Sequence, residues 1–287
     1  MREIADADAY VGFGMPRALF IAAPRLRWIH SAAAGVGSLL YPELSASDVI
    51  LTNSAGVHAV PMAEHVLGGL LFLLRQFDIA IAQQRAGVWN RDPFVGAETR
   101  VRELGECRAL IIGAGGIGTE IARRLSALGA RCTGIRRRPE RGVPEGFETV
   151  FGIDSLDSLL PSADILVIAA PATGATRGLV TAERLDHLPQ GALVVNVARG
   201  TLLDERALAD RLRAGRLGGA VLDVFEREPL PSDSELWKVP RLLLTPHVSA
   251  TSPRGYWPRE LELFIDNWAR FAAGRPLRNV VDTSAGY

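Results

Sequence analysis

Cysteine is scarce in this sequence, and neither sign of charge is in excess. Of the 287 residues only Cys107 and Cys132 are cysteines, and they form neither a CxxC pair nor a cluster with histidine. We therefore expect two reduced, mostly buried thiols, with no disulfide and no metal site. The 32 basic residues balance the 32 acidic residues, so the overall charge favours neither a nucleic acid nor an anionic membrane as partner.

Long apolar runs and a leader-like N-terminus are also absent. The longest apolar block, Val66 to Leu74, is far shorter than the roughly 20 residues that a membrane-spanning helix needs. The first ten residues carry acidic side chains and no apolar run, unlike a secretory signal peptide. We expect a cytoplasmic protein, long enough for about two domains with cores of their own.

The most informative feature that the sequence does contain is one glycine-rich stretch. Residues 109–112 have the pattern of a short buried strand, and a helical pattern begins a few residues later. Between them, Gly113 would allow a tight turn, Gly115 would leave room for a pyrophosphate, and Gly118 would let helix and strand pack closely. A glycine turn with a purely local role fits the same residues, so the motif alone does not decide the matter.

Arginines follow the next expected strand, which covers 130–135. At this point an NAD-binding unit typically has an acidic residue that binds the ribose 2′-hydroxyl. The sequence has Arg136, Arg137 and Arg138 instead. Guanidinium groups suit a 2′-phosphate, so these residues favour NADP. A solvated basic turn without a ligand is the alternative.

Apolar segments alternate with helical or turn segments along the chain, which predicts an α/β fold with parallel sheets. The helical pattern over 61–85 is apolar almost all the way round, so we expect one buried helix between domains or at a subunit contact. Two further helices are expected over 204–214 and 258–272. The other expected strands cover 9–13, 26–30, 49–52, 165–170, 193–197, 219–224 and 242–245.

Three polar residues follow successive expected strands near the C-terminal end. Arg199, Glu228 and His247 each come after such a strand, and the carboxyl ends of parallel strands share one edge of a sheet. An arginine there can bind a carboxylate, a histidine can transfer a proton near neutral pH, and a glutamate can orient the imidazole. A surface arginine, a surface glutamate and a histidine satisfied within a loop are the ordinary alternatives. The loop over 32–37, after the second strand, is equally compatible with ligand contacts and with a flexible turn.

Several spaced motifs occur in order after Gly113 to Gly118. They are Asn196-Val197-Ala198-Arg199-Gly200, Asp204-Glu205, the run from Gly218 to Leu230, and Thr245-Pro246-His247. Together they closely resemble the D-isomer-specific 2-hydroxyacid dehydrogenase family, in particular its glyoxylate/hydroxypyruvate reductase-like branch, from about Leu26 onward.

The resemblance implies two Rossmann-like or flavodoxin-like domains with an interdomain cleft, and a homodimer. The dinucleotide-binding domain would cover 58–252, and the substrate domain would combine 1–57 with 253–287.

The resemblance also assigns roles to individual residues. It implies that His247 is the acid/base, that Glu228 is its partner, and that Arg199 anchors the substrate carboxylate and carbonyl oxygen. The backbone of Ala34 and Gly35 would receive the other side of the carboxylate. The implied cofactor-binding residues are Gly113, Gly115, Gly116, Ile117, Gly118, Arg136, Arg137, Pro171, Thr176, Val197 and Asp223.

The implied reaction is the reversible reduction of a small 2-oxoacid to a D-2-hydroxyacid with NADPH. The same reaction with NADH, or a non-catalytic cofactor-sensing protein on the same fold, are alternatives. The sequence departs from the family pattern at Arg136, where an aspartate is usual, and at Gly37, where an aspartate often follows the glycine-valine pair. It also begins later than the family pattern, as if a first β-α unit of the substrate domain were missing.

Overall fold

The computed structural model describes residues 3–283, which form two compact units. One unit combines Met1–His58 with Thr251–Tyr287, and the other is the central segment Ala59–Ala250. Each unit contains its own parallel sheet, so the expected α/β class with parallel sheets is confirmed.

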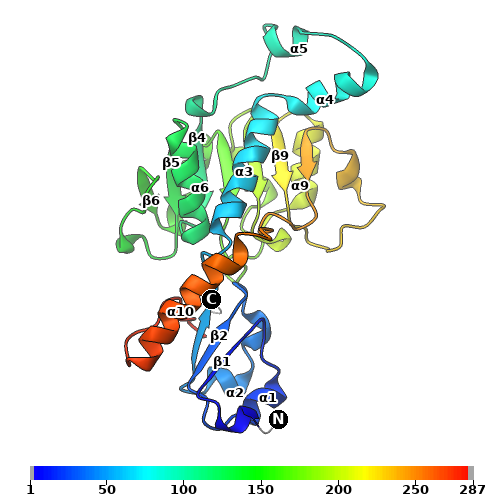
Figure 1. The fold of residues 1–287 in the computed structure, drawn as a ribbon. Helices are drawn as coiled ribbons and strands as arrows, with labels where there is room; N and C mark the ends of the chain where they lie inside the picture. Colours follow the sequence, from blue (N-terminus) through cyan, green and yellow to red (C-terminus); the bar gives the residue numbers. More distant parts are fainter. Residues whose placement is uncertain (1–2, 284–287) are drawn as a thin grey trace. The chain divides into compact units, whose positions relative to one another are not determined.

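The central unit is built on a seven-stranded sheet in which every neighbouring pair is parallel (Figure 1). The strand order is β10-β9-β8-β7-β4-β5-β6. The strands are β4 (Arg108–Ile112), β5 (Arg131–Ile135), β6 (Thr149–Phe151), β7 (Ile165–Ile168), β8 (Leu193–Asn196), β9 (Gly219–Leu222) and β10 (Leu242–Leu244). The chain adds β5 and β6 on one side of β4 and then crosses to β7 on the other side. The loops that leave β4 and β7 therefore flank the switch point, where ligands bind in open α/β sheets.

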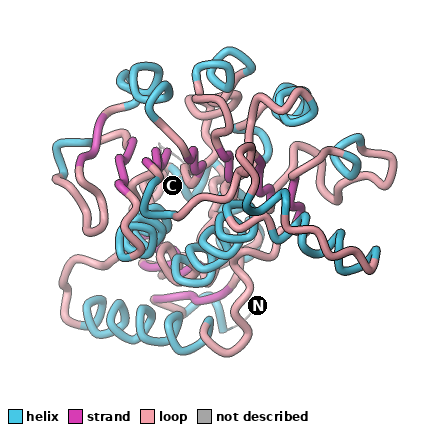
Figure 2. The backbone as a smooth tube through the Cα atoms, turned by 90° about the horizontal axis from the view of Figure 1, so that it is seen from above, coloured by secondary structure: helices cyan, strands magenta, loops and turns pink. Residues whose placement is uncertain are grey.

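Side chains of the central strands alternate between two apolar cores. Ala109 and Ile111 face one core with α3 (Ala59–Leu74) and α6 (Gly116–Ala127), whereas Leu110 and Ile112 face the other. The helices on that second face are α7 (Leu156–Leu159), α8 (Ala182–His187) and α9 (Glu205–Arg213). Figure 2 shows the row of strands with helices on both sides. Burial on both faces explains why the strand sequences are continuously apolar.

Both cysteines lie in this central unit. Cys107 and Cys132 are buried and form no disulfide, which confirms the expected buried thiols. Burial raises the pKa of Cys132 to about 12, so its thiol stays protonated.

The single helix expected over 61–85 is wrong, because two helices occupy this range. Helix α3 ends at Leu74, and α4 (Phe77–Ala86) follows at an angle of 64°. Between them Gln76 adopts a left-handed backbone, with φ of 54°, and its buried side chain donates to the carbonyl of Pro93 at 2.8 Å. The expected burial holds for one face of α3, but α4 has no buried residue.

A short helix, α5 (Asp92–Val95), follows α4. Among residues 3–283 no single helix is long and apolar enough to span a membrane, although the bent α3–α4 pair reaches the length and composition of a span.

The other unit has a three-stranded parallel sheet in the order β1-β2-β3. Its elements are β1 (Ala9–Gly12), α1 (Arg17–Ile21), β2 (Trp28–Ser31), α2 (Pro42–Ser45), β3 (Ile50–Asn53) and α10 (Tyr256–Ala272). Ile29 and Leu51 pack into an aliphatic core, while Trp28 faces α10, where its ring lies 5.7 Å from Phe264 and 5.2 Å from Phe271. The first and last parts of the chain thus complete one unit together.

Candidate active site

The glycine turn between β4 and α6 combines two crowded positions with one open position. Gly113 has φ of 108°, and a Cβ there would lie 2.6 Å from the backbone of Ala169, in the loop after β7. A Cβ on Gly118 would lie 2.1 Å from the carbonyl oxygen of Gly113. A Cβ on Gly115 would meet nothing within 4 Å. The open space therefore lies at the N-terminus of α6, where backbone N–H groups can bind a pyrophosphate.

Arg136 lies beside this turn. The backbone N–H groups of Gly113 and Ala114 both donate to the carbonyl of Ile135, at 2.8 and 3.0 Å, so the end of β5 is held against the turn. The half-buried Arg136 donates from Nη1 to the carbonyl of Gly142 at 3.3 Å and forms no ion pair within residues 3–283. Arg137 follows as an exposed residue. These residues fit a phosphorylated dinucleotide.

The loop after β7 is organised by a threonine. Thr176 donates from its hydroxyl to the carbonyl of Pro171 at 2.7 Å and accepts from the backbone N–H of Thr173 at 2.8 Å. Val197, at the end of β8, has a side chain buried in the core. Pro171 and Thr176 thus belong to one folded turn at the switch point, whereas the Val197 side chain faces away from solvent.

His247 and Glu228 form a hydrogen-bonded pair at the ends of adjacent strands. Imidazole Nδ1 lies 2.7 Å from Glu228 Oε2, and Glu228 Oε1 accepts from the backbone N–H of Phe225 at 2.9 Å. The side chain of His247 is 45% exposed, and its Nε2 makes no hydrogen bond within the described part of the chain. The pair therefore presents one imidazole nitrogen to solvent and holds the other.

Arg199 belongs to the same edge of the sheet. It follows β8 directly, and the side chain of Asn196 fixes its turn by donating to the Arg199 carbonyl at 3.0 Å. Burial alone would raise the pKa of Glu228, but its hydrogen bonds to His247 and Phe225 and the charges of His247 and Arg199 lower it. The structure thus joins His247 and Glu228 directly and places Arg199 in the loop after the neighbouring strand β8, where its Nη1 donates to the carbonyl of Ala198 at 2.6 Å.

The loop that carries Glu228 is packed tightly against the loop after β8. A Cβ on Gly200 would lie 1.9 Å from the carbonyl carbon of Phe225, so only glycine allows this approach. Glu205, in the first turn of α9, accepts from the backbone N–H of Glu226 at 2.6 Å. The backbone on either side of Arg199 and Glu228 is therefore fixed by close packing.

Asp223 holds the loop that carries His247. Its carboxylate is fully buried and accepts from the backbone N–H groups of Val248 and Ser249, both at 2.9 Å, and from the hydroxyl of Thr245 at 2.6 Å. Burial would raise the pKa of Asp223, but the hydrogen bonds from Ser249, Thr245 and Val248 lower it. Asp223 therefore remains an ionised anchor next to the acid/base pair.

His65 of α3 completes this network, and the sequence reading missed it. Because the Thr245 hydroxyl gives its proton to Asp223, His65 Nε2 donates to Thr245 Oγ1, at 3.1 Å. Thr245 could have been found from the Thr245-Pro246-His247 motif. His65 lies too far away in sequence for any local pattern to connect the two.

Ala34 and Gly35 lie in the other unit, on the loop after β2. Both residues are exposed, and neither backbone N–H donates a hydrogen bond within residues 3–283. The carbonyl of Ala34 is held by the side-chain amide of Asn53 at 2.8 Å. The loop thus leaves two neighbouring backbone N–H groups without a hydrogen bond among the described residues.

A glycine turn at a sheet switch point, with a histidine–glutamate pair and an arginine on the same sheet, defines a dinucleotide-dependent oxidoreductase. Residues 67–249 match the model of the D-isomer specific 2-hydroxyacid dehydrogenase NAD-binding domain. The chain belongs to the D-isomer specific 2-hydroxyacid dehydrogenase family and is an NAD(P)-dependent oxidoreductase.

Individual relatives extend the match beyond this domain. The chain is 35% identical to (S)-sulfolactate dehydrogenase of Chromohalobacter salexigens over 82% of its own length and 74% of the relative's. It is 32% identical to glyoxylate/hydroxypyruvate reductase A of Salmonella newport, over 95% of this chain and 85% of that one. A solved NADPH-dependent glyoxylate/hydroxypyruvate reductase from Sinorhizobium meliloti, in complex with NADP and sulfate, superimposes with a TM-score of 0.82 at 32% identity and covers 98% of this chain and 87% of its own. The expected family is confirmed.

Proposed function

We propose that this protein reduces a small 2-oxoacid to the D-2-hydroxyacid with NADPH. The observation that carries the proposal is the His247–Glu228 pair: Nδ1 and Oε2 are 2.7 Å apart, Nε2 makes no hydrogen bond among residues 3–283, and Arg199 lies in the loop after the adjacent strand β8. Relatives named as glyoxylate/hydroxypyruvate reductases support the same reaction class.

In this mechanism Glu228 accepts the hydrogen bond of Nδ1–H and so orients the imidazole. Nε2 of His247 then donates its proton to the oxygen of the substrate carbonyl, which becomes the hydroxyl group. Arg199 binds the carboxylate and stabilises charge on the carbonyl oxygen. The nicotinamide, when bound, supplies the hydride to C2 of the acid. In the reverse direction neutral His247 takes the hydroxyl proton.

The cofactor is proposed to bind along Gly113, Gly115, Gly116, Ile117 and Gly118, with Asp223 near its nicotinamide end. Arg136 and Arg137 would hold the 2′-phosphate, and Pro171, Thr176 and the backbone of Val197 would line the remaining part. The open position at Gly115 supports a dinucleotide, and the Arg136 guanidinium, which forms no ion pair among residues 3–283, supports NADP over NAD. Use of NADH with the same chemistry is the alternative.

The substrate carboxylate is proposed to bind the N–H groups of Ala34 and Gly35 in addition to Arg199. The unit containing 1–57 and 253–287 is therefore proposed as the substrate domain, and 58–252 as the dinucleotide-binding domain. We also propose that the protein is a cytoplasmic homodimer.

The test is the loss of NADPH absorbance with glyoxylate, hydroxypyruvate, pyruvate and sulfopyruvate, each repeated with NADH. Turnover with at least one acid, faster with NADPH, is expected. A protein that binds NADPH but reduces none of these acids would be the cofactor-sensing alternative. Faster turnover with NADH would instead show that Arg136 does not select the cofactor.

A further inference from the structure

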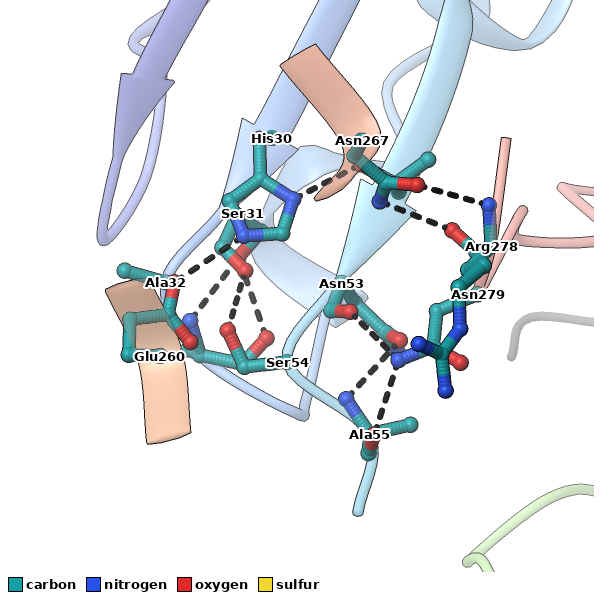
Figure 3. Close-up of polar contacts among 12 residues, drawn as sticks. His30, Ser31, Ala32, Asn53, Ser54, Ala55, Glu260, Asn267, Arg278 and Asn279 are labelled. Carbon is teal, nitrogen blue, oxygen red and sulfur yellow. Dashed lines mark hydrogen bonds and ion pairs between the residues drawn. The ribbon is translucent and has the colours of Figure 1, made fainter. Parts of the chain in front are cut away.

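A buried carboxylate–imidazole pair lies in the unit that contains Ala34 and Gly35, and the mechanism does not use it. Glu260 of α10 and His30 of β2 are 3% and 0% exposed, and Glu260 Oε1 lies 2.9 Å from His30 Nε2. Figure 3 shows Glu260 and Ser54 beside His30 and Ser31. The other carboxylate oxygen, Oε2, is buried without a hydrogen-bond partner among the described residues. Burial of a carboxylate with one oxygen unbonded lowers the stability of the fold, so stability alone does not account for Glu260 at this position.

The orientation of His30 is fixed by its neighbours. Trp28 donates from Nε1 to the Thr52 hydroxyl at 2.9 Å, and that hydroxyl lies 2.8 Å from His30 Nδ1. The Thr52 hydroxyl can therefore donate to Nδ1, which leaves Nε2–H of His30 to donate to Glu260. The hydrogen bonds run in one direction from Trp28 to Glu260 and set the position of α10 against β2.

This position decides where Tyr256 lies. Tyr256 and Glu260 are one helical turn apart on α10, about 6 Å along the axis. Their partners are His30 on β2 and the backbone carbonyl of Ala32, the residue directly after β2, and these two residues are also only two positions apart. The hydroxyl of Tyr256 donates to the carbonyl of Ala32, at the start of the loop. Burial and the charge of Glu260 raise the pKa of Tyr256 to about 12, so this hydroxyl keeps its proton.

The carbonyls of the loop are held one after another. Ser54 donates from its hydroxyl to the Ser31 carbonyl at 2.8 Å and from its backbone N–H to the Ala33 carbonyl at 3.3 Å. With Tyr256 on Ala32 and Asn53 on Ala34, four consecutive carbonyls accept hydrogen bonds from β3, its following loop and α10. The backbone direction of the loop is thereby fixed, and the N–H groups of Ala34 and Gly35 remain available.

We propose that Glu260 and His30 are positioning residues for the substrate carboxylate. Their hydrogen bond fixes the position of α10 along β2, so that the Tyr256 hydroxyl reaches the carbonyl of Ala32. The backbone of the loop, and with it the direction of the free N–H groups of Ala34 and Gly35, is thereby set. This inference rests on the proposed 2-oxoacid reductase function and adds a determinant of substrate affinity in the unit that does not contain the acid/base pair.

The test compares steady-state kinetics of the wild type and Glu260→Gln, with glyoxylate or hydroxypyruvate as the varied acid. Glu260→Gln keeps an acceptor for His30 but replaces a charge-assisted hydrogen bond by a weaker neutral one, so we expect KM for the acid to rise about tenfold, with kcat and KM for NADPH within about twofold of the wild type. The matched control is Leu26→Ala, buried in the same unit before β2 and away from the loop, which lowers stability. KM for the acid should be unchanged in this control.

A KM for the acid that is unchanged in folded Glu260→Gln, or raised equally in Leu26→Ala, would overturn the proposal. If Glu260→Gln does not fold, the double variant His30→Phe/Glu260→Leu removes the polar pair while filling the same space. It should show the same selective rise in KM.

Amide hydrogen exchange gives a readout that does not depend on turnover. The N–H groups of Ala33 and Ser54 are both bonded within the loop network and should exchange faster in Glu260→Gln but not selectively in Leu26→Ala. Unchanged exchange would count against the positioning role. A wild type that reduces none of the acids would overturn the proposed function instead.

Discussion

His247 adopts a backbone conformation that is uncommon for residues other than glycine. Its φ is 54°, and its N–H donates to the carbonyls of Asp223 at 2.9 Å and Thr245 at 3.0 Å. Such a conformation persists only where surrounding contacts enforce it. The buried carboxylate of Asp223 supplies those contacts through the next two backbone N–H groups. The direction of the imidazole is therefore set by the backbone as well as by Glu228.

Replacement of this imidazole gives the most direct residue-scale prediction. His247→Gln removes the proton donor, so kcat should fall about 10²- to 10⁴-fold. NADPH affinity, measured by fluorescence titration, should stay within about twofold of the wild type, since the glycine turn and Arg136 are untouched. Turnover near the wild-type rate would show that another group transfers the proton.

Asp223→Asn should reveal the anchoring role of this carboxylate through the pH dependence of stability. The folded-state pKa of Asp223 is lowered, so its ionised form stabilises the fold above the ordinary carboxyl pKa of about 4 and stops doing so as the pH falls through the lowered value. An asparagine must turn its NH₂ group toward one of the N–H donors. We expect a loss of about 1–3 kcal/mol at neutral pH, measured by urea unfolding. This difference should shrink below about pH 4, and a pH-independent difference would contradict the assignment.

The charge of Arg136 should decide the cofactor. Arg136→Asp replaces a cation that suits a 2′-phosphate by an anion that suits the 2′-hydroxyl. The ratio of kcat/KM for NADPH over NADH should fall at least about tenfold, since a charge-assisted hydrogen bond is lost and a repulsion is added. The matched control Arg138→Asp changes the charge by the same amount two residues away. An equal effect of both variants would mean that only the general potential matters.

At the scale of elements, different glycines of the turn have different roles: Gly113 is needed for packing, whereas Gly115 borders the open space that we propose for the cofactor. Gly115→Ala places a methyl group in open space at the start of α6, so the melting temperature should change little while KM for NADPH rises about tenfold or more. Gly113→Ala puts a Cβ at 2.6 Å from the backbone of Ala169 and should destabilise the unit itself. Both are read by thermal unfolding and kinetics. Equal NADPH affinity in Gly115→Ala and the wild type would place the pyrophosphate elsewhere.

The central strands β7, β8 and β9 and their parallel arrangement could be predicted because burial on both faces makes each of them an almost wholly apolar run. Strand β6 was missed, since Thr149–Phe151 is short and has no fully buried residue. The break at Gln76 was missed because neither glycine nor proline marks it, and the contact with Pro93 that fixes it is a tertiary one.

The same limit applies to the site. Arg199, Glu228 and His247 each come soon after a strand. Their positions in the sequence were therefore enough to predict that all three lie at one edge of the sheet. The pairs His65–Thr245 and His30–Glu260 join residues that are 180 and 230 positions apart. Only the packing of a helix against a sheet brings such residues together, and no local pattern contains that information.

At the scale of the whole molecule, exposed apolar side chains in the segment from the end of α4 through α5 make the proposed homodimer testable. Trp89 is 91% exposed, and Val88 and Val95 are also exposed. Trp89→Glu should shift the protein to a monomer, measured by light scattering, because a charge cannot be buried in an apolar contact. Trp237→Glu, at a 55% exposed position elsewhere in the central unit, is the control and should leave the mass unchanged. A monomeric wild type would contradict the dimer.

The division of one unit between the two ends of the chain has a consequence for synthesis. Strands β1 to β3 leave the ribosome well before α10, which covers Trp28 and supplies Glu260. At about 5–20 residues per second, the chain from the end of β3 to the start of α10 takes roughly 10 to 40 s to make. During this time the central unit can fold as a continuous segment. The indole of Trp28 and the imidazole of His30 are not yet covered by α10. We therefore expect the unit that contains β1 to β3 to complete its fold after the central unit during synthesis.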